Sequence, residues 1–306
     1  PKYPKMSAAA ADPVDYKALL PPHWLEEVKG WVRDDVPSID IGGLVVGDSP
    51  KEAHLWMKSP GVVAGVPFFD AVFEFLGCTV EWRVQEGDSI DPSQTPGGKV
   101  LAAVVTGPAR KLLLGERTAL NTLSRASGVA TAAAKAVSVA RSHNWHGYVA
   151  GTRKTTPGFR IVEKYALLVG GAATHRLDLS NMVMLKDNHI WSAGSITKAV
   201  QHAKTAAGFT SKIEVEARTP EEAIEAASAG ADIVMLDNMA PEVLKESAAA
   251  LKAAFPHLTV EASGGITLET MPEYFSPNVD VISRGSLTQG YGCIDFSLKI
   301  LQQQKP

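Results

Sequence analysis

The sequence has little cysteine, no long apolar run and no excess of basic charge. Its two cysteines, Cys78 and Cys293, are too few for a disulfide framework and lack the paired spacing of a zinc site, so we expect both to be small core residues. No apolar run approaches the roughly 20 residues that cross a bilayer, and no charged segment followed by an apolar stretch indicates secretion. We therefore expect a cytoplasmic protein without a membrane segment.

The charge balance also limits the partners of the protein. A formal net charge of -3 lacks the basic footprint that binding to a nucleic-acid backbone needs, so we expect no nucleic-acid partner. Residues 1–13 are rich in proline, lysine and alanine without periodicity, and we expect a disordered tail there. Because the net charge is negative, we expect any cluster of basic residues in the remaining chain to be local and to have a specific function.

The chain after this tail begins with mixed strand and helix patterns. Three strand-like runs lie at residues 54–58, 79–84 and 100–106. Residues 68–76 have helical spacing and follow Pro67, so the first part of the chain is predicted to form a small α+β domain. The next stretch, 108–142, is poor in helix breakers and rich in alanine, serine and leucine, which predicts one or two helices that join two domains.

From residue 148 onward, strand patterns alternate with helical patterns. Six strands are expected, at residues 148–151, 182–185, 212–216, 232–236, 258–263 and 279–283. Helical segments such as 220–229 and 241–255 fill the intervals between them. Such a repeat predicts a parallel sheet with right-handed crossovers, either closed as a barrel or open and doubly wound.

The faces of the strands decide between a barrel and an open sheet. Alternate side chains share one face of a strand, so Glu214 and Glu216 point away from the side of Ile213 and Val215. An open doubly wound sheet is apolar on both faces, whereas the interior of a barrel can reach a wet, functional mouth. We therefore predict an α/β fold with a parallel barrel.

Basic residues follow the expected strands, at the edge where parallel α/β folds bind ligands. Arg153 and Lys154 come after the first strand, ahead of a helix whose N-terminal amide groups favour anions. His175 and Arg176 lie in a turn, and an arginine there suits bidentate recognition of carboxylate or phosphate. Lys186 follows the second strand as a salt-bridged residue, a Schiff-base nucleophile or an anion clamp, and the neighbouring cations favour the clamp.

Carboxylates and glycines follow the later strands. Glu216 and Asp237 end the third and fourth strands, where they hold sugar hydroxyls or a divalent cation, stabilise a developing positive charge, or merely neutralise lysines. The runs Ser-Gly-Gly from Ser263 and Arg-Gly-Ser from Arg284 end the last two strands, where barrel loops commonly bind phosphate. Together these residues predict a site for a polyanionic, sugar-containing substrate with a metal.

Long contiguous motifs identify a family. They are Gly-Thr-Arg-Lys-Thr-Thr-Pro-Gly-Phe-Arg from residue 151, Glu-Lys-Tyr-Ala-Leu-Leu-Val-Gly-Gly from 163, His-Arg-Leu-Asp-Leu from 175 and Met-Leu-Lys-Asp-Asn-His from 184. Shorter ones are Ile-Glu-Val-Glu from residue 213 and Glu-Ala-Ser-Gly-Gly-Ile from 261. From about residue 24 to 299 the sequence resembles the quinolinate phosphoribosyltransferases, the decarboxylating enzymes of NAD synthesis.

The resemblance implies an architecture and a reaction. An N-terminal α/β sandwich domain, 14–115 joined by 290–306, would accompany linking helices and an incomplete, seven-stranded α/β barrel over 116–289. Two copies would form a homodimer in which each sandwich caps the partner's barrel, with hexamers, as trimers of dimers, in some members. The enzyme, a pentosyltransferase, would transfer the phosphoribosyl group of phosphoribosyl pyrophosphate to quinolinate with loss of carbon dioxide, giving nicotinate mononucleotide.

The resemblance also implies roles for individual residues. Arg153, His175 and Arg176 would hold the two carboxylates of quinolinate, and Arg117 would reach into the neighbouring subunit's site. Lys154 and Lys186 would contact both substrates. Sugar hydroxyls and Mg²⁺ on phosphoribosyl pyrophosphate would meet Glu216 and Asp237, with the metal contact direct or indirect. The other expected substrate-binding residues are Thr152 and the 5-phosphate cradle of Ser263, Gly264, Gly265 and Gly285.

Three alternatives remain open at this stage. A nicotinate phosphoribosyltransferase would share the transfer without the decarboxylation, although several arginines near the acceptor favour a dicarboxylate. A Schiff-base aldolase would use Lys186 as its nucleophile. A barrel without catalysis, serving assembly or metabolite sensing, is disfavoured because every expected strand end retains a chemically useful group.

Overall fold

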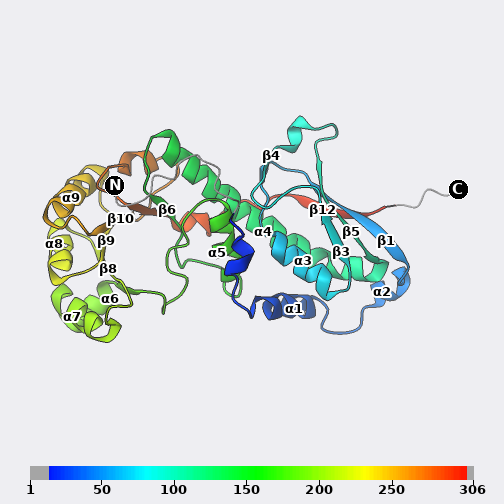
Figure 1. Cartoon of the computed structure of the whole chain (residues 1–306), viewed down its shortest axis with the longest axis horizontal. Coiled ribbons are helices and arrows are strands. Elements are labelled where there is room, and N and C mark those ends of the chain that lie inside the picture. Colours follow the sequence, from blue (N-terminus) through cyan, green and yellow to red (C-terminus); the bar gives the residue numbers. More distant parts are fainter. Residues whose placement is uncertain (1–13, 302–306) are drawn as a thin grey trace. The chain divides into compact units, whose positions relative to one another are not determined.

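The computed structural model describes residues 14–301, so the tail predicted at 1–13 and the last part of segment 290–306 lie outside the described residues (Figure 1). The described chain divides into two compact units. Unit 1 contains Lys135–Lys154 and Ala172–Gln289, and unit 2 contains residues 14–134, Thr155–Gly171 and residues 290–301.

Unit 2 is built on a four-stranded antiparallel sheet in the order β12-β1-β5-β3. Its strands are β1 (Pro50–Met57), β3 (Thr79–Trp82), β5 (Val100–Pro108) and β12 (Phe296–Ile300). The last strand pairs with the first, with Leu55 opposite Leu298. Two short strands, β2 (Gly61–Val62) and β4 (Ser89–Ile90), pair separately. The C-terminal strand therefore completes the sheet of this unit.

The helices of unit 2 bury aromatic residues. They are η1 (Tyr16–Leu19), α1 (Trp24–Asp35), α2 (Ile41–Val46), α3 (Val66–Phe75), η2 (Pro92–Gln94) and α5 (Arg160–Val169). The ring of Phe68 on α3 meets both Trp24 and Tyr165 edge-on, at centroid distances of 5.4 Å each. The sequence predicted α3 from residue 68, and it begins earlier because Glu86 accepts the amide hydrogens of Gly65 and Val66 at 2.8 and 2.9 Å.

The stretch predicted to contain one or two helices forms a single helix, α4 (Ala109–Ser142). Its residues up to Ala134 belong to unit 2 and its last eight, from Lys135, to unit 1. Small residues allow the chain to approach closely: a Cβ at Gly128 would lie 2.4 Å from the carbonyl oxygen of Gly292. The helix is uninterrupted because no proline or other strong breaker occurs in it.

Unit 1 is built on a six-stranded parallel sheet in the order β6-β11-β10-β9-β8-β7. The strands are β6 (Tyr148–Ala150), β7 (Val183–Leu185), β8 (Ile213–Ala217), β9 (Ile233–Asp237), β10 (Thr259–Ser263) and β11 (Val281–Ser283). Each of the six corresponds to a strand predicted from the sequence, so the α/β prediction with an incomplete parallel barrel is confirmed. The seventh strand that the resemblance implied is reduced, among the described residues, to a bridge between Ala150 and Ala173.

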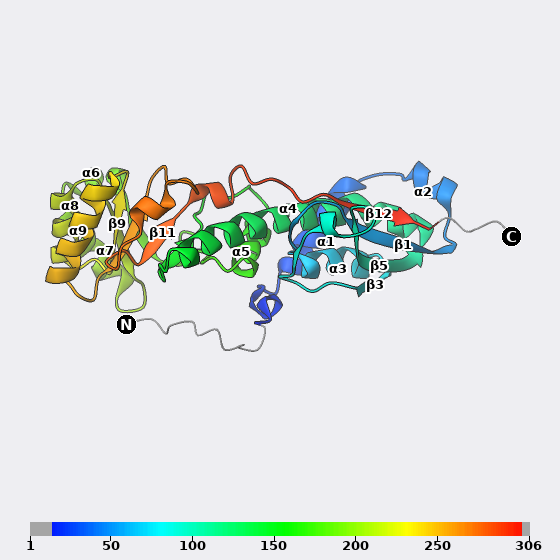
Figure 2. The ribbon, with the colours of Figure 1, turned by 90° about the horizontal axis from the view of Figure 1, so that it is seen from above.

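Helices cover the outside of this sheet (Figures 1 and 2). They are α6 (Asp187–Ala193), α7 (Ile196–Ala207), α8 (Pro220–Ala229) and α9 (Pro241–Ala254), with short η3 (Met271–Tyr274) and η4 (Gly285–Leu287). On the other side, Glu214 and Glu261 are fully or almost fully buried. The charged strand face predicted from alternation therefore points into the barrel.

The compact units do not divide the chain at residue 115, where the sequence prediction placed the boundary. Residues 116–134 of α4 and the whole of α5 pack with unit 2, although they were assigned with the barrel. Cys78 is buried as expected, but Cys293 is exposed, so the prediction for Cys293 is wrong. Every helix within residues 14–301 is too short or too polar to span a membrane.

Candidate active site

A cavity of about 800 Å³ opens at the carboxyl ends of the strands of unit 1, and all six strand ends contribute to its lining. It brings together twelve of the thirteen residues predicted for the site: Thr152, Arg153, Lys154, His175, Arg176, Lys186, Glu216, Asp237, Ser263, Gly264, Gly265 and Gly285. Parallel strands present their carboxyl ends at one edge, which is why residues so distant in sequence meet.

Two arginines and a histidine form a cationic recess in this cavity. Partial burial and the neighbouring charge of Arg153 lower the pKa of Arg176. His175 is 9% exposed at its side chain and adopts a left-handed backbone conformation, with φ of 56°. A recess with two adjacent guanidinium groups suits a ligand that carries two negative charges.

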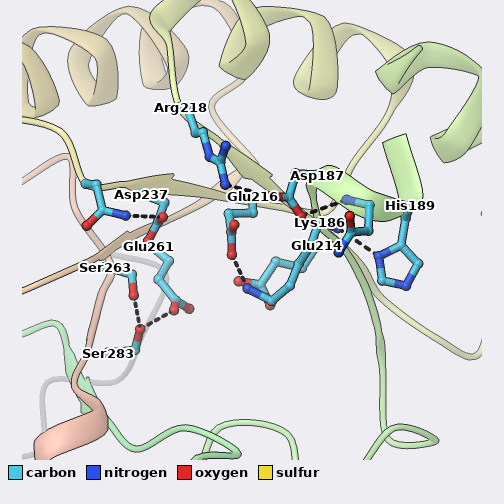
Figure 3. A network of polar contacts seen from close by, with 12 residues as sticks. Lys186, Asp187, His189, Glu214, Glu216, Arg218, Asp237, Glu261, Ser263 and Ser283 are labelled. Atoms are coloured by element: carbon cyan, nitrogen blue, oxygen red, sulfur yellow. Dashed lines mark hydrogen bonds and ion pairs between the residues drawn. The ribbon is translucent and has the colours of Figure 1, made fainter. Parts of the chain in front are cut away.

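Lys186 and Glu216 form an ion pair at the ends of β7 and β8 (Figure 3). Nearby, Asp237 accepts a hydrogen bond from the Asn238 amide at 2.5 Å. Burial raises the pKa of Asp237 above its usual range, and Glu216 raises it further. The carboxylates of Glu216 and Asp237, beside Lys186, offer oxygen atoms that can bind Mg²⁺ or accept hydrogen bonds from sugar hydroxyls.

The glycine loop after β10 comes close to the end of β9. Gly264 and Gly265 have φ of 96° and 62°, and Asn238 also adopts a left-handed conformation, with φ of 56°. A Cβ at Gly264 would lie 2.4 Å from the Asn238 side-chain oxygen. The close approach of Asn238 therefore requires glycine at position 264, and both glycines line the cavity.

The glycine loop after β11 is bound to the loop after β6. A Cβ at Gly285 would lie 2.9 Å from Cδ of Lys154, so the lysine side chain crosses directly over this glycine. The Thr288 hydroxyl donates to the carbonyl oxygen of Lys154 at 2.7 Å. These two contacts place the Lys154 side chain on the glycine-rich side of the cavity.

Arg284 supports both glycine loops, a function that the sequence did not reveal. Its Nε donates to the carbonyl oxygen of Ile266 at 3.1 Å, and its Nη2 donates to the Ser286 hydroxyl at 3.1 Å. Burial lowers the pKa of this guanidinium. The position of Arg284 directly after a strand could have indicated a role at the site. Its partner, Ile266, lies 18 residues away in sequence, and sequence spacing does not reveal such a contact.

Two buried carboxylates below the cavity were also absent from the predicted site. Burial raises the pKa of Glu214 well above its usual range, and the neighbouring Glu261 raises it further. Neither oxygen of Glu214 has a hydrogen-bond partner among residues 14–301. The alternation of side chains along β8 could have indicated Glu214, because Glu214 and Glu216 share the face that points into the barrel.

The thirteenth predicted residue, Arg117, does not line this cavity. It lies on α4 within unit 2, its side chain is 67% exposed, and its Nη2 contacts Glu116 at 3.1 Å. The prediction assigned Arg117 to a neighbouring subunit's site, and it stays a prediction.

The sequence matches two family profiles in succession. Residues 40–127 match the N-terminal domain of quinolinate phosphoribosyl transferase, and residues 129–299 match its C-terminal domain. The chain is 56% identical over 290 residues to the rat protein named nicotinate-nucleotide pyrophosphorylase [carboxylating], covering 94% of this chain and 95% of that one. The human protein of the same name is 55% identical over 287 residues, with the same coverage of both chains.

The fold agrees with a solved structure of that kind. The nicotinate-nucleotide pyrophosphorylase from Francisella tularensis superposes with a TM-score of 0.82 at 30% identity, covering 92% of this chain and 98% of that one. Sequence and fold thus agree with these proteins over nearly the whole length. The chain belongs to the quinolinate phosphoribosyltransferase family.

Proposed function

We propose that the cavity of unit 1 is the place where this chain performs the reaction of its family. The chain has carboxylating nicotinate-nucleotide pyrophosphorylase activity, in NAD biosynthesis. In the direction of synthesis, the phosphoribosyl group of phosphoribosyl pyrophosphate passes to quinolinate, and nicotinate mononucleotide, pyrophosphate and carbon dioxide result. The observation that carries the assignment is the convergence of two arginines, two lysines and two carboxylates on one cavity at the strand ends.

Quinolinate would occupy the cationic recess. Its two adjacent carboxylates match two guanidinium groups, Arg153 and Arg176, beside the ring of His175. The lowered pKa of Arg176 supports this placement, because repulsion from Arg153 and burial both make the empty recess unfavourable for cations. A bound dicarboxylate would offset that repulsion, whereas the single carboxylate of nicotinate would offset less of it.

Phosphoribosyl pyrophosphate would lie across the rest of the cavity. The loops that contain Ser263, Gly264, Gly265 and Gly285 would cradle the 5-phosphate, with Thr152 at the edge. Lys154 and Lys186 would contact both substrates. Glu216 and Asp237 would hold ribose hydroxyls and Mg²⁺, directly or through the substrate, and their oxygen atoms are of the type that this ion prefers.

The chemistry follows from the placement of these charges. Bound Mg²⁺ would supply positive charge to the leaving pyrophosphate. Lys154 and Lys186 would add to it as the bond from ribosyl C1 to oxygen breaks and its electron pair leaves with pyrophosphate. Glu216 and Asp237 would stabilise the positive charge that develops on the ribosyl ring. The pyridine nitrogen then forms the new bond to C1 with its lone pair, positioned by the recess.

Decarboxylation requires no organic cofactor. Once the pyridine nitrogen is bonded to ribose, it carries a positive charge that stabilises the electron pair left on the neighbouring ring carbon when that carbon loses its carboxylate. The bond between that carbon and its carboxylate breaks, carbon dioxide leaves, and a proton takes its place on the ring. Protein groups serve mainly to position the reactants and stabilise charge in this step.

The working assembly is proposed to be a homodimer that shares its sites. Arg117 is exposed in unit 2 and makes only a contact of limited strength with the adjacent Glu116, so it is suited to act on another molecule. In this proposal the Arg117 side chain of one subunit completes the quinolinate recess of its partner.

The assay that tests the function measures labelled carbon dioxide released from carboxyl-labelled quinolinate with phosphoribosyl pyrophosphate and Mg²⁺. Release is expected only with all three components, and nicotinate tested in parallel should yield no nucleotide. Turnover of nicotinate alone would instead indicate the sister transferase. Borohydride with carbonyl substrates should trap no adduct on Lys186, because the proposed function uses Lys186, the partner of Glu216 in an ion pair, as an anion clamp and not as a nucleophile.

A further inference from the structure

A continuous set of hydrogen bonds lies below the proposed quinolinate recess. The Ser283 hydroxyl donates to Oε1 of Glu261 at 2.5 Å and lies 3.1 Å from the Ser263 hydroxyl (Figure 3). On its other side, Glu261 lies 3.1 Å from Nε2 of His175. The side chain of Glu261 is 3% exposed, so water contributes little to holding it. One buried carboxylate thus connects the start of the glycine loop with the histidine of the recess.

The hydrogen bonds of His175 fix which ring nitrogen carries the hydrogen. The backbone N–H of Arg176 donates to Nδ1 of His175 at 2.8 Å. A peptide N–H is always a donor, so Nδ1 must present a lone pair to it. The ring hydrogen is then on Nε2, which donates it to Glu261. Both ring nitrogens are therefore occupied inside the protein.

The backbone at this turn needs such support. His175 adopts φ of 56°, a left-handed conformation that is unfavourable for a residue with a Cβ. The Thr174 hydroxyl donates to the carbonyl oxygen of His175 at 2.8 Å, and the ring accepts from the next amide. The direction in which Arg176 leaves the turn depends on the ring, and the ring depends on Glu261.

We infer that Glu261 is a positioning residue for quinolinate, which holds the His175 ring and, through the Arg176 amide, aims the Arg176 guanidinium into the recess. Ser283 links this support to Ser263 at the phosphate side, so both substrate sides share one buried anchor. The inference deepens the proposed function and rests on it, because it takes Arg176 as a ligand of the substrate.

A metal site is the competing interpretation of the same cluster. Donor atoms of His175, Glu214 and Glu261 lie within 4.8 Å of one another, and Glu214 is fully buried. A metal bound by all three residues would need the lone pair of Nε2, because Nε2 is the ring nitrogen that lies near both carboxylates. A neutral imidazole has only one lone pair for this purpose, and the Arg176 amide already uses it. The hydrogen-bond pattern therefore favours positioning over metal binding.

The test compares Glu261→Ala with Glu261→Gln by steady-state kinetics on the full chain. Glu261→Ala should raise KM for quinolinate at least about tenfold, with a smaller change in KM for phosphoribosyl pyrophosphate. Glu261→Gln keeps an oxygen that can accept from Nε2 and should recover most of the loss. The matched control is Glu214→Gln, which removes a buried carboxylate that forms no hydrogen bond within residues 14–301 and should shift KM for quinolinate less than about threefold.

A second variant separates failure of this inference from failure of the proposed function. If Arg176→Ala raises KM for quinolinate but Glu261→Ala does not, the positioning role is wrong while the recess stands. If Arg176→Ala changes nothing, the proposed placement of quinolinate is wrong.

A measurement on unsubstituted protein keeps the test decisive even if Glu261→Ala fails to fold. Nitrogen NMR of histidine-labelled protein should show hydrogen on Nε2 of His175 and none on Nδ1, with the signals assigned from a His175→Gln sample. Hydrogen on Nδ1 would overturn the inference. So would one zinc ion retained per chain after dialysis against chelator and lost in Glu261→Gln, because that result would establish a metal site.

Discussion

A Cβ atom at Gly264 would lie 2.4 Å from Oδ1 and 2.6 Å from the backbone nitrogen of Asn238. Both residues have left-handed backbone conformations, with φ of 96° and 56°. Two loops that follow neighbouring strands, β9 and β10, therefore touch through their backbones, and no side chain fits between them. Ser263, Gly264 and Gly265 line the cavity, so this close approach shapes its wall.

Gly264→Ala should accordingly weaken the use of phosphoribosyl pyrophosphate. The new methyl group must displace Asn238 and strains the backbone, so kcat/KM for this substrate should fall at least about tenfold. Gly194→Ala is the matched control, because Gly194 also has a left-handed conformation, with φ of 89°, but no atom lies within 4 Å of its Cβ position. Equal losses in both variants would mean that backbone strain, and not the contact with Asn238, sets the effect.

Asp237→Asn should raise the Mg²⁺ concentration needed for half-maximal rate. The variant keeps the shape of the side chain but removes the negative charge proposed to attract the ion, so the requirement should rise at least about tenfold. The measurement is initial rate against free Mg²⁺ at saturating quinolinate. Asp187→Asn serves as the control, because Asp187 pairs with Arg218 at 2.7 Å and does not line the cavity. An unchanged Mg²⁺ requirement in Asp237→Asn would argue for metal contacts through the substrate alone.

Local signals predicted much of this fold. Helix α8 has the bounds expected from sequence because Thr219 caps it by accepting from the Glu222 amide, Pro220 occupies its first position and Gly230 ends it with φ of 95°. The parallel strands were recognisable because each is short, carries apolar residues on at least one face and is followed by a chemically useful residue. The lining of the cavity then follows from the geometry of parallel strands.

Long-range contacts account for what the sequence did not reveal. The guanidinium of Arg284 binds the carbonyl oxygen of Ile266, and Glu86 caps α3 from a loop 20 residues away in sequence. No periodicity encodes such pairs. The sequence also did not reveal that α5 packs with unit 2. Helix α5 lies between two barrel strands in the sequence, but its residue Tyr165 contacts Phe68 of unit 2.

The raised pKa of Glu86 predicts that the stability of the fold depends on pH. Burial raises its pKa from 4.5 to about 7, against the opposing effect of the amides of Gly65 and Val66. Because the folded state binds the proton more tightly than the unfolded state, the stabilising contribution is fully present below pH 4.5 and is lost as pH rises to about 7. The loss amounts to at most about 3 kcal/mol.

Glu86→Gln should remove this dependence, because a glutamine cannot ionise. Urea unfolding of both proteins at pH 5 and pH 8 measures it: the stability of the unsubstituted protein relative to the variant should fall between the two conditions. Glu74→Gln, an exposed substitution on helix α3, the helix that Glu86 caps, corrects for the general effect of one charge. A relative stability that is constant with pH would show that Glu86 ionises normally.

Arg117→Ala and Lys186→Ala together test whether active sites are shared between subunits. Each variant alone should be folded and nearly inactive, because Arg117 is an exposed residue of α4 and Lys186 lies at the mouth of the barrel, where neither supports the core. Mixing them after subunit exchange should restore about a quarter of the normal activity, since half of randomly formed dimers are mixed and each mixed dimer has one intact site out of two. Exchange must be verified independently, for example with differently tagged subunits. If each variant alone is inactive, exchange is complete and no activity returns, Arg117 acts on the site of its own subunit and the sites are not shared.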